Sequence, residues 1–272
     1  MKFNGIDVST HNGTIDWKKV VESIDFAIIR AGYGKNNIDT MLSKNVKGCQ
    51  DYSIDFGFYW FSYALSESDA KKEADYVCDL ADKYKPNYPI CYDWEYDSDE
   101  YAKKMGISMT NDKRKAFANS FLKRVEERGY YAMLYTNIDY LNKGFSDLTK
   151  TYDVWLAQWG VNSPSKSCGI WQKTSSGRVN GINGNVDLNI SYNDYAGLIT
   201  NNKGNKKENK EKEKKEQLAK YKDIFWNMYL GIAEDVKKGK YGNGADRKKK
   251  LKAQGYDYDV VKNIVNILVK YD

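Results

Sequence analysis

Pro89-Ile90-Cys91-Tyr92-Asp93-Trp94-Glu95-Tyr96 is a short apolar run that ends in two carboxylates separated by one aromatic residue. Such a run is typical of a buried strand, in which successive side chains point to opposite faces. Asp93 and Glu95 then share a face, with Cα atoms roughly 6.6–7 Å apart. Two carboxyl groups at that spacing resist ionising together, so the pKa of one is expected to rise. A neutral acid beside a carboxylate is suited to glycosidic bond cleavage, and a solvated acidic strand end is the alternative.

Seven more β-like runs lie around this one, and helical patterns separate several of them. The predicted strands are Phe3–Val8, Phe26–Ala31, Phe56–Tyr63, Ile90–Glu95, Tyr131–Thr136, Val154–Trp159, Gly169–Lys173 and Val186–Ile190. The predicted helices are Trp17–Ser23, Met41–Asp51, Ser68–Tyr84 and Asp112–Arg128. Eight strands in this alternation predict an α/β fold, a (β/α) barrel of TIM type that is depleted of helices in its second half.

Four acidic residues lie at strand ends of the predicted barrel, where active sites of this fold are found. They are Asp7 on the first strand, Asp93 and Glu95 on the fourth, and Asp187 on the eighth. The first and eighth strands are neighbours in a closed barrel, so we expect Asp7 and Asp187 to lie close together. Aromatic residues take equivalent positions: Tyr33, Tyr59, Trp60, Tyr63, Tyr135, Trp159 and Trp171. The pattern predicts an acidic cleft with aromatic walls.

Composition excludes several other chemistries. His11 is the only histidine, which rules out a Ser-His-Asp triad and a multi-histidine metal site. The four cysteines are scattered, and the sequence has neither a phosphate loop nor a dinucleotide-binding glycine motif. We therefore expect acid–base work to fall to carboxylates, without a cofactor or a metal. The first residues lack the charged start and apolar stretch of a signal peptide, and no apolar run is long enough to span a membrane.

Charge divides the chain into two parts. Residues 1–200 carry 24 Lys and Arg against 26 Asp and Glu, a net of −2, whereas the rest carries 19 against 11, a net of +8. We predict a barrel domain over 1–199, a charged linker over 200–217 and a helical domain over 218–272. Apolar residues at helical spacing, with Gly239 and Gly255 as stops, predict a small bundle of three helices. The positive charge could also indicate nucleic-acid binding, but no known nucleic-acid-binding motif accompanies it, so we do not expect nucleic acid as a partner.

Taken together, the motifs of the first part resemble family 25 glycoside hydrolases, the Chalaropsis-type lysozymes common among phage endolysins. The matching segments are Gly5–Ser9, Phe26–Gly34, Gly57–Ala64, Tyr92–Glu95, Trp155–Trp159, Trp171-Gln172 and Val186–Asn189. The resemblance covers residues 1–200 and implies a flattened, irregular barrel. It implies an N-acetylmuramidase that hydrolyses the β-1,4 bond between N-acetylmuramic acid and N-acetylglucosamine in peptidoglycan, with retention of configuration. It also implies that Glu95 is the general acid and Asp93 its partner, and that Asp7 and Asp187 complete the acidic cluster.

The resemblance leaves the nucleophile and the sugar contacts open. Asp93 or Asp187 attacks C1, or one of them orients the substrate's own N-acetyl group for attack, the route we favour. The candidate substrate-binding residues are Tyr59, Tyr63, Tyr135, Trp159 and Gln172. For the aromatic ones a plain core role is an equal alternative, and Gln172 alternatively satisfies a loop.

The C-terminal part resembles a short cell-wall-binding repeat found in some phage lysozymes. The matching residues are Gly239, Tyr241-Gly242-Asn243-Gly244, Arg247, Leu251 and Gly255-Tyr256-Asp257-Tyr258. The candidate wall-binding residues are Gly242, Asn243, Asp246, Arg247, Tyr256 and Tyr258, with peptidoglycan as the partner. One copy gives no avidity, and we hypothesise that the helix beginning at Leu218 pairs chains through Leu218, Tyr221 and Phe225.

Three functional interpretations follow. The leading one is a phage or prophage endolysin, made in the host cytoplasm without a signal peptide and released to the wall through a phage-made (holin) membrane hole, with a host autolysin as its nearest variant. A second is another barrel glycosidase such as a chitinase, although Tyr88–Glu95 lacks the earlier acids of the chitinase Asp-x-x-Asp-x-Asp-x-Glu motif. A third is a glycan-binding protein without catalysis, which would not need the Asp93 and Glu95 pair.

Overall fold

The computed structural model describes residues 2–200 and 227–271. The chain divides into two compact units, Met1–Asn202 and Lys203–Asp272. Each unit is described by itself. The predicted linker 200–217, apart from residue 200, and the proposed pairing residues Leu218, Tyr221 and Phe225 lie outside the described residues.

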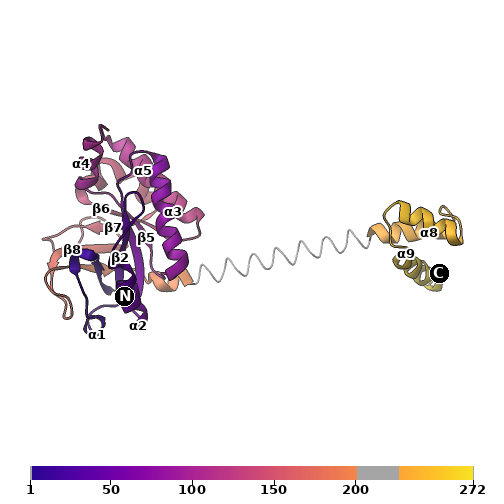
Figure 1. Ribbon diagram of the computed structural model, residues 1–272, viewed down its shortest axis with the longest axis horizontal. Helices are drawn as coiled ribbons and strands as arrows, with labels where there is room; N and C mark the ends of the chain where they lie inside the picture. The colour runs from indigo at the N-terminus through magenta and orange to yellow at the C-terminus, as the bar shows by residue number, and fades with distance from the viewer. Residues whose placement is uncertain (1, 201–226, 272) are drawn as a thin grey trace. The chain divides into compact units, whose positions relative to one another are not determined.

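A closed barrel forms the first unit (Figure 1). Its strands are β1 (Phe3–Val8), β2 (Phe26–Tyr33), β3 (Asn37–Ile38), β4 (Asp55–Phe61), β5 (Ile90–Asp93), β6 (Ala132–Asn137), β7 (Asp153–Ala157), β8 (Ile170–Gly177) and β9 (Val186–Ser191). They hydrogen-bond in the order β1-β9-β8-β7-β6-β5-β4-β2-β3, and the ring is closed because β1 pairs with β2 as well as with β9. Eight strands therefore make the barrel, as predicted, and the two-residue β3 lies outside it as an antiparallel partner of β2.

The last strand departs from a regular (β/α) barrel. Neighbouring strands run parallel from β1 through β2 and around to β8, but β9 runs antiparallel to both β8 and β1. Residues 178–185 join β8 to β9, and a parallel connection needs a crossover of a dozen or more residues, usually with a helix. The short connection therefore forces the chain to return as a hairpin.

Helices cover the barrel mainly in its first half (Figure 1). They are α1 (Trp17–Val20), α2 (Leu42–Asp51), α3 (Glu67–Tyr84), α4 (Tyr96–Lys104), α5 (Asn111–Glu127) and α6 (Ile138–Tyr140), and the described residues 195–200 are also helical. Short turns complete them: a 3-10 turn (Thr10–Asn12), a π turn (Leu141–Phe145) and a second 3-10 turn (Leu148–Lys150). The predicted scarcity of helices in the second half is confirmed. Helix α4 was not predicted, although acids in its first turn and lysines in its last turn complement the helix dipole.

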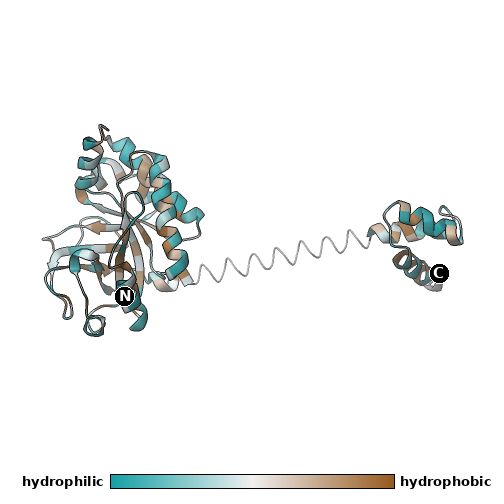
Figure 2. Cartoon of the chain, in the orientation of Figure 1, coloured by the Kyte–Doolittle hydropathy of each residue, from teal (hydrophilic) through white to brown (hydrophobic). Residues whose placement is uncertain are grey.

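Figure 2 shows apolar residues along the central strands and hydrophilic stretches on the helices around them. Alternate residues of the strands belong to two apolar layers. Residues that point outward from the strands, such as Ile29, Phe58 and Tyr92, are buried together with the apolar faces of the helices. Inward-pointing residues fill the part of the barrel nearer the starts of its parallel strands. They are Phe26, Ile28, Cys91, Met133, Trp155 and Ile170. A Cβ atom at Gly5 would overlap the ring of Phe26, so glycine is required there. The inward positions nearer the strand ends carry polar groups instead, and these form the site described below.

The second unit is helical. It contains the described helical residues 227–237, α8 (Gly244–Ala253) and α9 (Tyr258–Tyr271). Its small core consists of Tyr229, Ala233, Val236, Leu251, Val261 and Ile264. Within the described ranges of the whole chain, no helix has the length and apolar character needed to cross a membrane.

Candidate active site

The four predicted acids meet at one end of the barrel. Asp7 is an inward residue near the end of β1, Asp93 ends β5, and Glu95 follows in extended backbone just before α4. Asp187 is the register partner of Asp7 across β1 and β9. Our placement of Asp187 at the C-terminal end of its strand was wrong: it is the second residue of β9. It reaches the same rim because β9 runs antiparallel.

Asp7 is the most fully bonded of these acids. It is 6% exposed and accepts hydrogen bonds from Gln172 Nε2 (3.0 Å) and Asn189 Nδ2 (2.8 Å). Burial, reinforced by the charge of Asp187, raises the pKa of Asp7 well above its usual range, against the effect of the two amide donors. Burial also raises the pKa of Asp187, while its hydrogen bond with Asp7 opposes that rise. Burial therefore favours the protonated form at both of these neighbouring carboxyl groups.

Asp93 is buried without full hydrogen bonding. It is 3% exposed, and its Oδ1 has no hydrogen-bond partner among the described residues. Burial raises the pKa of Asp93 well above its usual range, and the charges of Glu95 and Asp7 add to the rise. Arg30 opposes it only in part, because its guanidinium is paired with Asp39 (Nε to Oδ2, 2.7 Å). A buried polar atom without a partner is costly, so Asp93 is a place where a substrate group can bind.

Glu95 is half-buried at the start of α4. Its backbone N–H donates to Ser98 Oγ (3.2 Å), which fixes the backbone at the point where the strand becomes a helix. Burial raises the pKa of Glu95, and the nearby charge of Asp97 raises it further. A hydrogen bond with Tyr135 acts in the opposite direction. Glu95 is thus biased toward its protonated form and lies next to the carboxyl of Asp93.

Gln172 connects the acids to the aromatic wall. Its Oε1 accepts hydrogen bonds from Tyr135 OH (3.2 Å) and Trp159 Nε1 (3.2 Å), while its Nε2 donates to Asp7. Gln172 is 3% exposed, so its side chain serves the site and does not merely satisfy a loop. Trp159 is 53% exposed and offers an open aromatic face, whereas Tyr135 is 8% exposed.

The other two predicted aromatic residues lie on either side of this network. Tyr59 is half-buried in the barrel, with its ring edge-to-face against Trp155 (6.1 Å between centroids). Tyr63 is partly exposed and packs against Tyr101 (4.8 Å). Tyr63 also lines a 350 Å³ pocket, together with Thr10, His11, Arg30, Tyr33, Ile38, Asp39, Thr40, Phe61 and Asp97. Tyr59 therefore lies among the residues inside the barrel, whereas Tyr63 lies at a pocket.

Two site residues were missed at the level of sequence. Asn189 holds Asp7 and accepts a hydrogen bond from Trp155 Nε1 (2.7 Å). It lies two residues after Asp187, so strand alternation would have placed it on the same face. Asp97 raises the pKa of Glu95 and of Tyr63, but it is in the helix that was not predicted. Within the described ranges, no group of three or more His, Cys, Asp or Glu side chains is arranged to hold a metal ion.

The predicted wall-binding residues make contacts inside the second unit. Arg247 donates from Nε to Gly242 O (2.9 Å) and from Nη2 to Asn243 Oδ1 (2.9 Å), which fixes the loop before α8. Tyr256 packs edge-to-face on Tyr229. Tyr258 lies beneath Lys248 Nζ (5.5 Å), and Asp246 is exposed in the first turn of α8. Several of these residues therefore shape the unit itself.

A barrel with clustered, partly protonated carboxyl groups at the strand ends and an aromatic wall beside them defines a glycoside hydrolase site. Comparison with known proteins agrees with this class. The family model of the glycosyl hydrolases of family 25 matches residues 6–182, and that of the CW_7 repeat matches residues 231–269. The chain belongs to glycosyl hydrolase family 25; it is a glycoside hydrolase of the lysozyme type that carries a C-terminal CW_7 repeat.

Individual relatives show the same assignment. Lysozyme M1 of Streptomyces globisporus is 29% identical over 220 residues, 72% of this chain and 69% of that protein. The modular autolysin LytC of Streptococcus pneumoniae, solved with a synthetic peptidoglycan ligand, is 31% identical with a TM-score of 0.62. The match covers 70% of this chain but only 47% of LytC. The bacterial lysozyme of Streptomyces coelicolor is 26% identical, with a TM-score of 0.62, 72% of this chain and 94% of that chain covered.

Proposed function

We propose that this protein is an N-acetylmuramidase that hydrolyses the β-1,4 bond between N-acetylmuramic acid and N-acetylglucosamine in bacterial peptidoglycan. The observation that carries the proposal is the cluster of Asp7, Asp93, Glu95 and Asp187, in which burial raises every carboxyl pKa. Such a cluster holds protons at pH values where isolated carboxyl groups have lost them. The likeness to lysozyme M1 and to LytC supports peptidoglycan as the substrate.

Glu95 is the general acid in this proposal. It is half-buried, so it is reached from solvent more readily than Asp7 or Asp93, and its raised pKa favours the protonated form that a general acid needs. It protonates the glycosidic oxygen as the bond to C1 breaks. After the leaving sugar departs, the same carboxylate takes a proton from the water that attacks C1.

Asp93 orients the nucleophile that the substrate brings. Its unpartnered Oδ1 accepts the N–H of the muramic acetamido group, so that the acetamido carbonyl oxygen attacks C1 as the bond to the leaving sugar breaks, which gives a cyclic oxazolinium ion that keeps its N–H. Water then opens that ring at C1, and the configuration is retained. Direct attack on C1 by Asp93 or Asp187 is the competing route. This route requires the attacking carboxyl to be ionised. Burial opposes the ionisation of both residues, and it does so more strongly at Asp93, which is buried, than at Asp187, which is only half-buried.

One digestion experiment tests the reaction. Purified peptidoglycan is treated with wild type, with Glu95→Gln and with Glu100→Gln, an exposed glutamate of α4 that serves as the matched control. The products are reduced with borohydride and identified by mass spectrometry. We expect new muramic acid reducing ends from wild type and from the control, and none from Glu95→Gln. New N-acetylglucosamine ends, the product expected of a chitinase-like cut, would refute the proposal, as would equal activity of Glu95→Gln.

We further propose that the protein acts as a phage endolysin whose second unit binds the wall. The CW_7 repeat supports the wall-binding part of this role, and its resemblance to repeats of phage lysozymes supports the phage origin. The protein would accumulate in the host cytoplasm and reach the wall once a phage-made membrane hole opens. Lysis of cells producing the protein only after their membrane is permeabilised is the expected result. Lysis during production alone would indicate export by the cell itself, as for an autolysin.

A further inference from the structure

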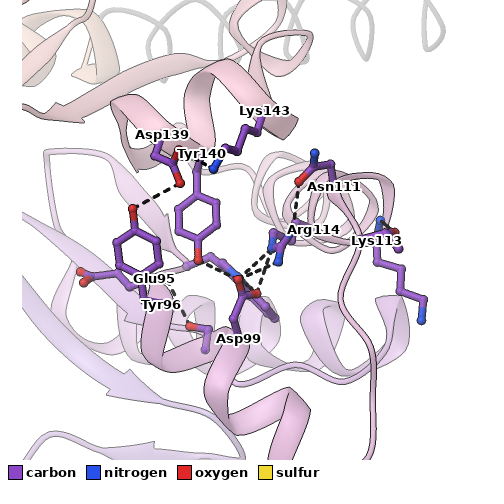
Figure 3. A network of polar contacts seen from close by, with 12 residues as sticks. Glu95, Tyr96, Asp99, Asn111, Lys113, Arg114, Asp139, Tyr140 and Lys143 are labelled. Carbon is purple, nitrogen blue, oxygen red and sulfur yellow. Dashed lines mark hydrogen bonds and ion pairs between the residues drawn. The ribbon is translucent and has the colours of Figure 1, made fainter.

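Asp99 collects hydrogen bonds from three directions, one helical turn after Glu95 (Figure 3). Trp94 Nε1 donates to its Oδ1 (3.1 Å), and Tyr140 OH donates to its Oδ2 (2.8 Å). Arg114 of α5 binds both oxygens, from Nε to Oδ1 (2.8 Å) and from Nη2 to Oδ2 (2.7 Å). We call Trp94, Asp99, Arg114 and Tyr140 the Asp99 junction. It joins the end of β5 to three helical elements, α4, α5 and α6.

Trp94 lies between Asp93 and Glu95 and points the other way. It is 1% exposed and packs edge-to-face on Phe117 of α5 (6.0 Å between ring centroids). Because successive side chains of extended backbone point to opposite faces, an outward Trp94 keeps both neighbouring carboxyls turned into the barrel. The hydrogen bond from its indole to Asp99 fixes the orientation of the ring.

The residue that follows Glu95 is tied to the same place. The ring of Tyr96 packs on the ring of Tyr140 (5.1 Å), and its hydroxyl donates to Asp139 (3.3 Å) (Figure 3). Tyr140 in turn donates to Asp99. Both residues that flank Glu95 are therefore held by contacts that lead to the Asp99 junction, although Asp99 itself does not touch the acids of the cluster in any hydrogen bond described above.

The junction keeps its charge while the site titrates. Partial burial opposes the ionisation of Asp99, but the hydrogen bonds from Arg114, Tyr140 and Trp94 together lower its pKa below the usual value. The pKa of Glu95 is shifted in the opposite direction. Asp99 therefore loses its proton at lower pH than Glu95, so its hydrogen bonds with Arg114 are charge-assisted while Glu95 is still protonated.

We propose that Asp99 is a positioning residue for the catalytic acid: through Trp94 and the first turn of α4 it holds Glu95 at the distance from the glycosidic oxygen that proton transfer requires. This inference rests on the proposed role of Glu95. A displacement of about 1 Å at a reacting group can cost about 100-fold in rate. Loss of the junction should therefore be seen in the turnover number and far less in substrate affinity.

The test compares Asp99→Asn with Asp75→Asn in the full chain, with peptidoglycan fragments as substrate. Asp75 is a suitable control because it also accepts hydrogen bonds from arginine, in its case from two residues, Arg124 Nε (2.9 Å) and Arg128 Nη1 (2.9 Å), between α3 and α5. Like Asp99→Asn, Asp75→Asn removes one negative charge from a carboxyl that is hydrogen-bonded to arginine. We expect kcat of Asp99→Asn to fall about 10- to 100-fold with KM within about twofold of wild type, and the control to keep its kcat.

A second substrate separates positioning from loss of folding. This substrate is a β-glycoside whose leaving group is dinitrophenolate. Dinitrophenolate departs without needing a proton, so a misplaced general acid has little effect on the rate of its release. We expect the kcat defect of Asp99→Asn to shrink to less than about threefold on this substrate. An equal defect on both substrates, or a kcat equal to that of Asp75→Asn, would overturn the inference. The proposed muramidase activity would still stand if wild type and Glu95→Gln behave as described above.

Discussion

Asp7 and Asp187 face each other as register partners across β1 and β9, the antiparallel strand pair that closes the barrel. One comes from the first strand of the chain and the other from the last strand of the barrel. Their carboxyl groups are hydrogen-bonded: burial and the charge of Asp187 raise the pKa of Asp7, whereas the hydrogen bond with Asp7 opposes the rise that burial causes in the pKa of Asp187. The pairing of β1 with β9 therefore has two effects: it helps to close the barrel, and it sets the pKa values of these two carboxyl groups.

The alkaline limit of activity should move when Asp97 is neutralised. Glu95 must carry a proton to act as an acid, so activity is lost as the pH rises through its raised pKa. The charge of Asp97 contributes to that rise, second only to burial. Asp97→Asn should therefore lower the pKa of Glu95 and shift the alkaline limb of the kcat/KM profile to lower pH. Initial rates on peptidoglycan fragments across pH check this, and an unmoved or higher limb would contradict it.

Asp93→Asn should stabilise the protein while it removes activity. The pKa of Asp93 is raised in the folded state, so folding disfavours its ionised form, and stability falls as pH rises from the ordinary aspartate pKa of about 3.9 toward the folded value. Asparagine cannot ionise and avoids this loss. We expect the melting temperature at pH 7 to rise by about 2–4 °C, corresponding to about 1 kcal/mol, with the rate reduced at least about 100-fold.

Calorimetry at two pH values is the measurement for this prediction. At about pH 3.5, below the unfolded pKa, Asp93 is protonated in both states and the advantage of asparagine should vanish. A substitution that destabilises the protein equally at both pH values would show that the carboxyl of Asp93 contributes to the fold in another way.

Trp155 of β7 and Trp159, which follows the end of β7, should differ in what their removal affects. Trp159 is 53% exposed, so Trp159→Ala should leave stability within about 0.5 kcal/mol and raise KM about fivefold by loss of a sugar-stacking face. Trp155 is 1% exposed and bonded to Asn189, so Trp155→Ala should cost about 3–5 kcal/mol. Denaturant unfolding and steady-state kinetics distinguish the two. An unchanged KM for Trp159→Ala would remove it from the substrate-binding residues.

Wall binding by the second unit should depend on salt. The described residues 227–271 carry ten Lys and Arg against five Asp and Glu, and Lys249, Lys250 and Lys252 of α8 are all exposed. Reversal of these three charges to Glu in the full chain should weaken co-sedimentation with cell walls about tenfold at low salt. The difference should disappear at about 1 M salt, where the Debye length is about 3 Å.

A control with the same change in net charge separates a local patch from overall charge. Lys44, Lys71 and Lys72 are exposed on α2 and α3 of the barrel unit. Their reversal to Glu should leave co-sedimentation close to that of wild type. Equal weakening by the two triple variants would show that net charge alone attracts the protein to the wall.

Much of the barrel could be predicted from sequence because its strands are short apolar runs with inward polar residues at their ends. Strand alternation brought Asp93 and Glu95 to one face, and barrel closure brought Asp7 near Asp187. The direction of β9 was not predicted, since a strand pattern of period two is the same in both directions. The direction of β9 could have been predicted from the short connection over residues 178–185, which is too short for a parallel crossover.

The supporting network was harder to predict than the acids. Gln172 joins Asp7 to Tyr135 and Trp159 through contacts between residues far apart in the chain, and no local pattern specifies them. Asp99 looks in sequence like one more acid at a helix start. Its partners Arg114 and Tyr140 come from two other helices, so its role could be recognised only after those helices had been placed.

Strand β9 also determines the point during synthesis at which the acid cluster is complete. A ribosome that has not yet reached Val186 holds a chain without Asp187 and Asn189, and β1 has no partner on its second edge. Every chain that stops before Val186 therefore lacks part of the acid cluster and one of the two donors that hold Asp7. The acid cluster is complete only once β9 has been made, at the end of barrel synthesis.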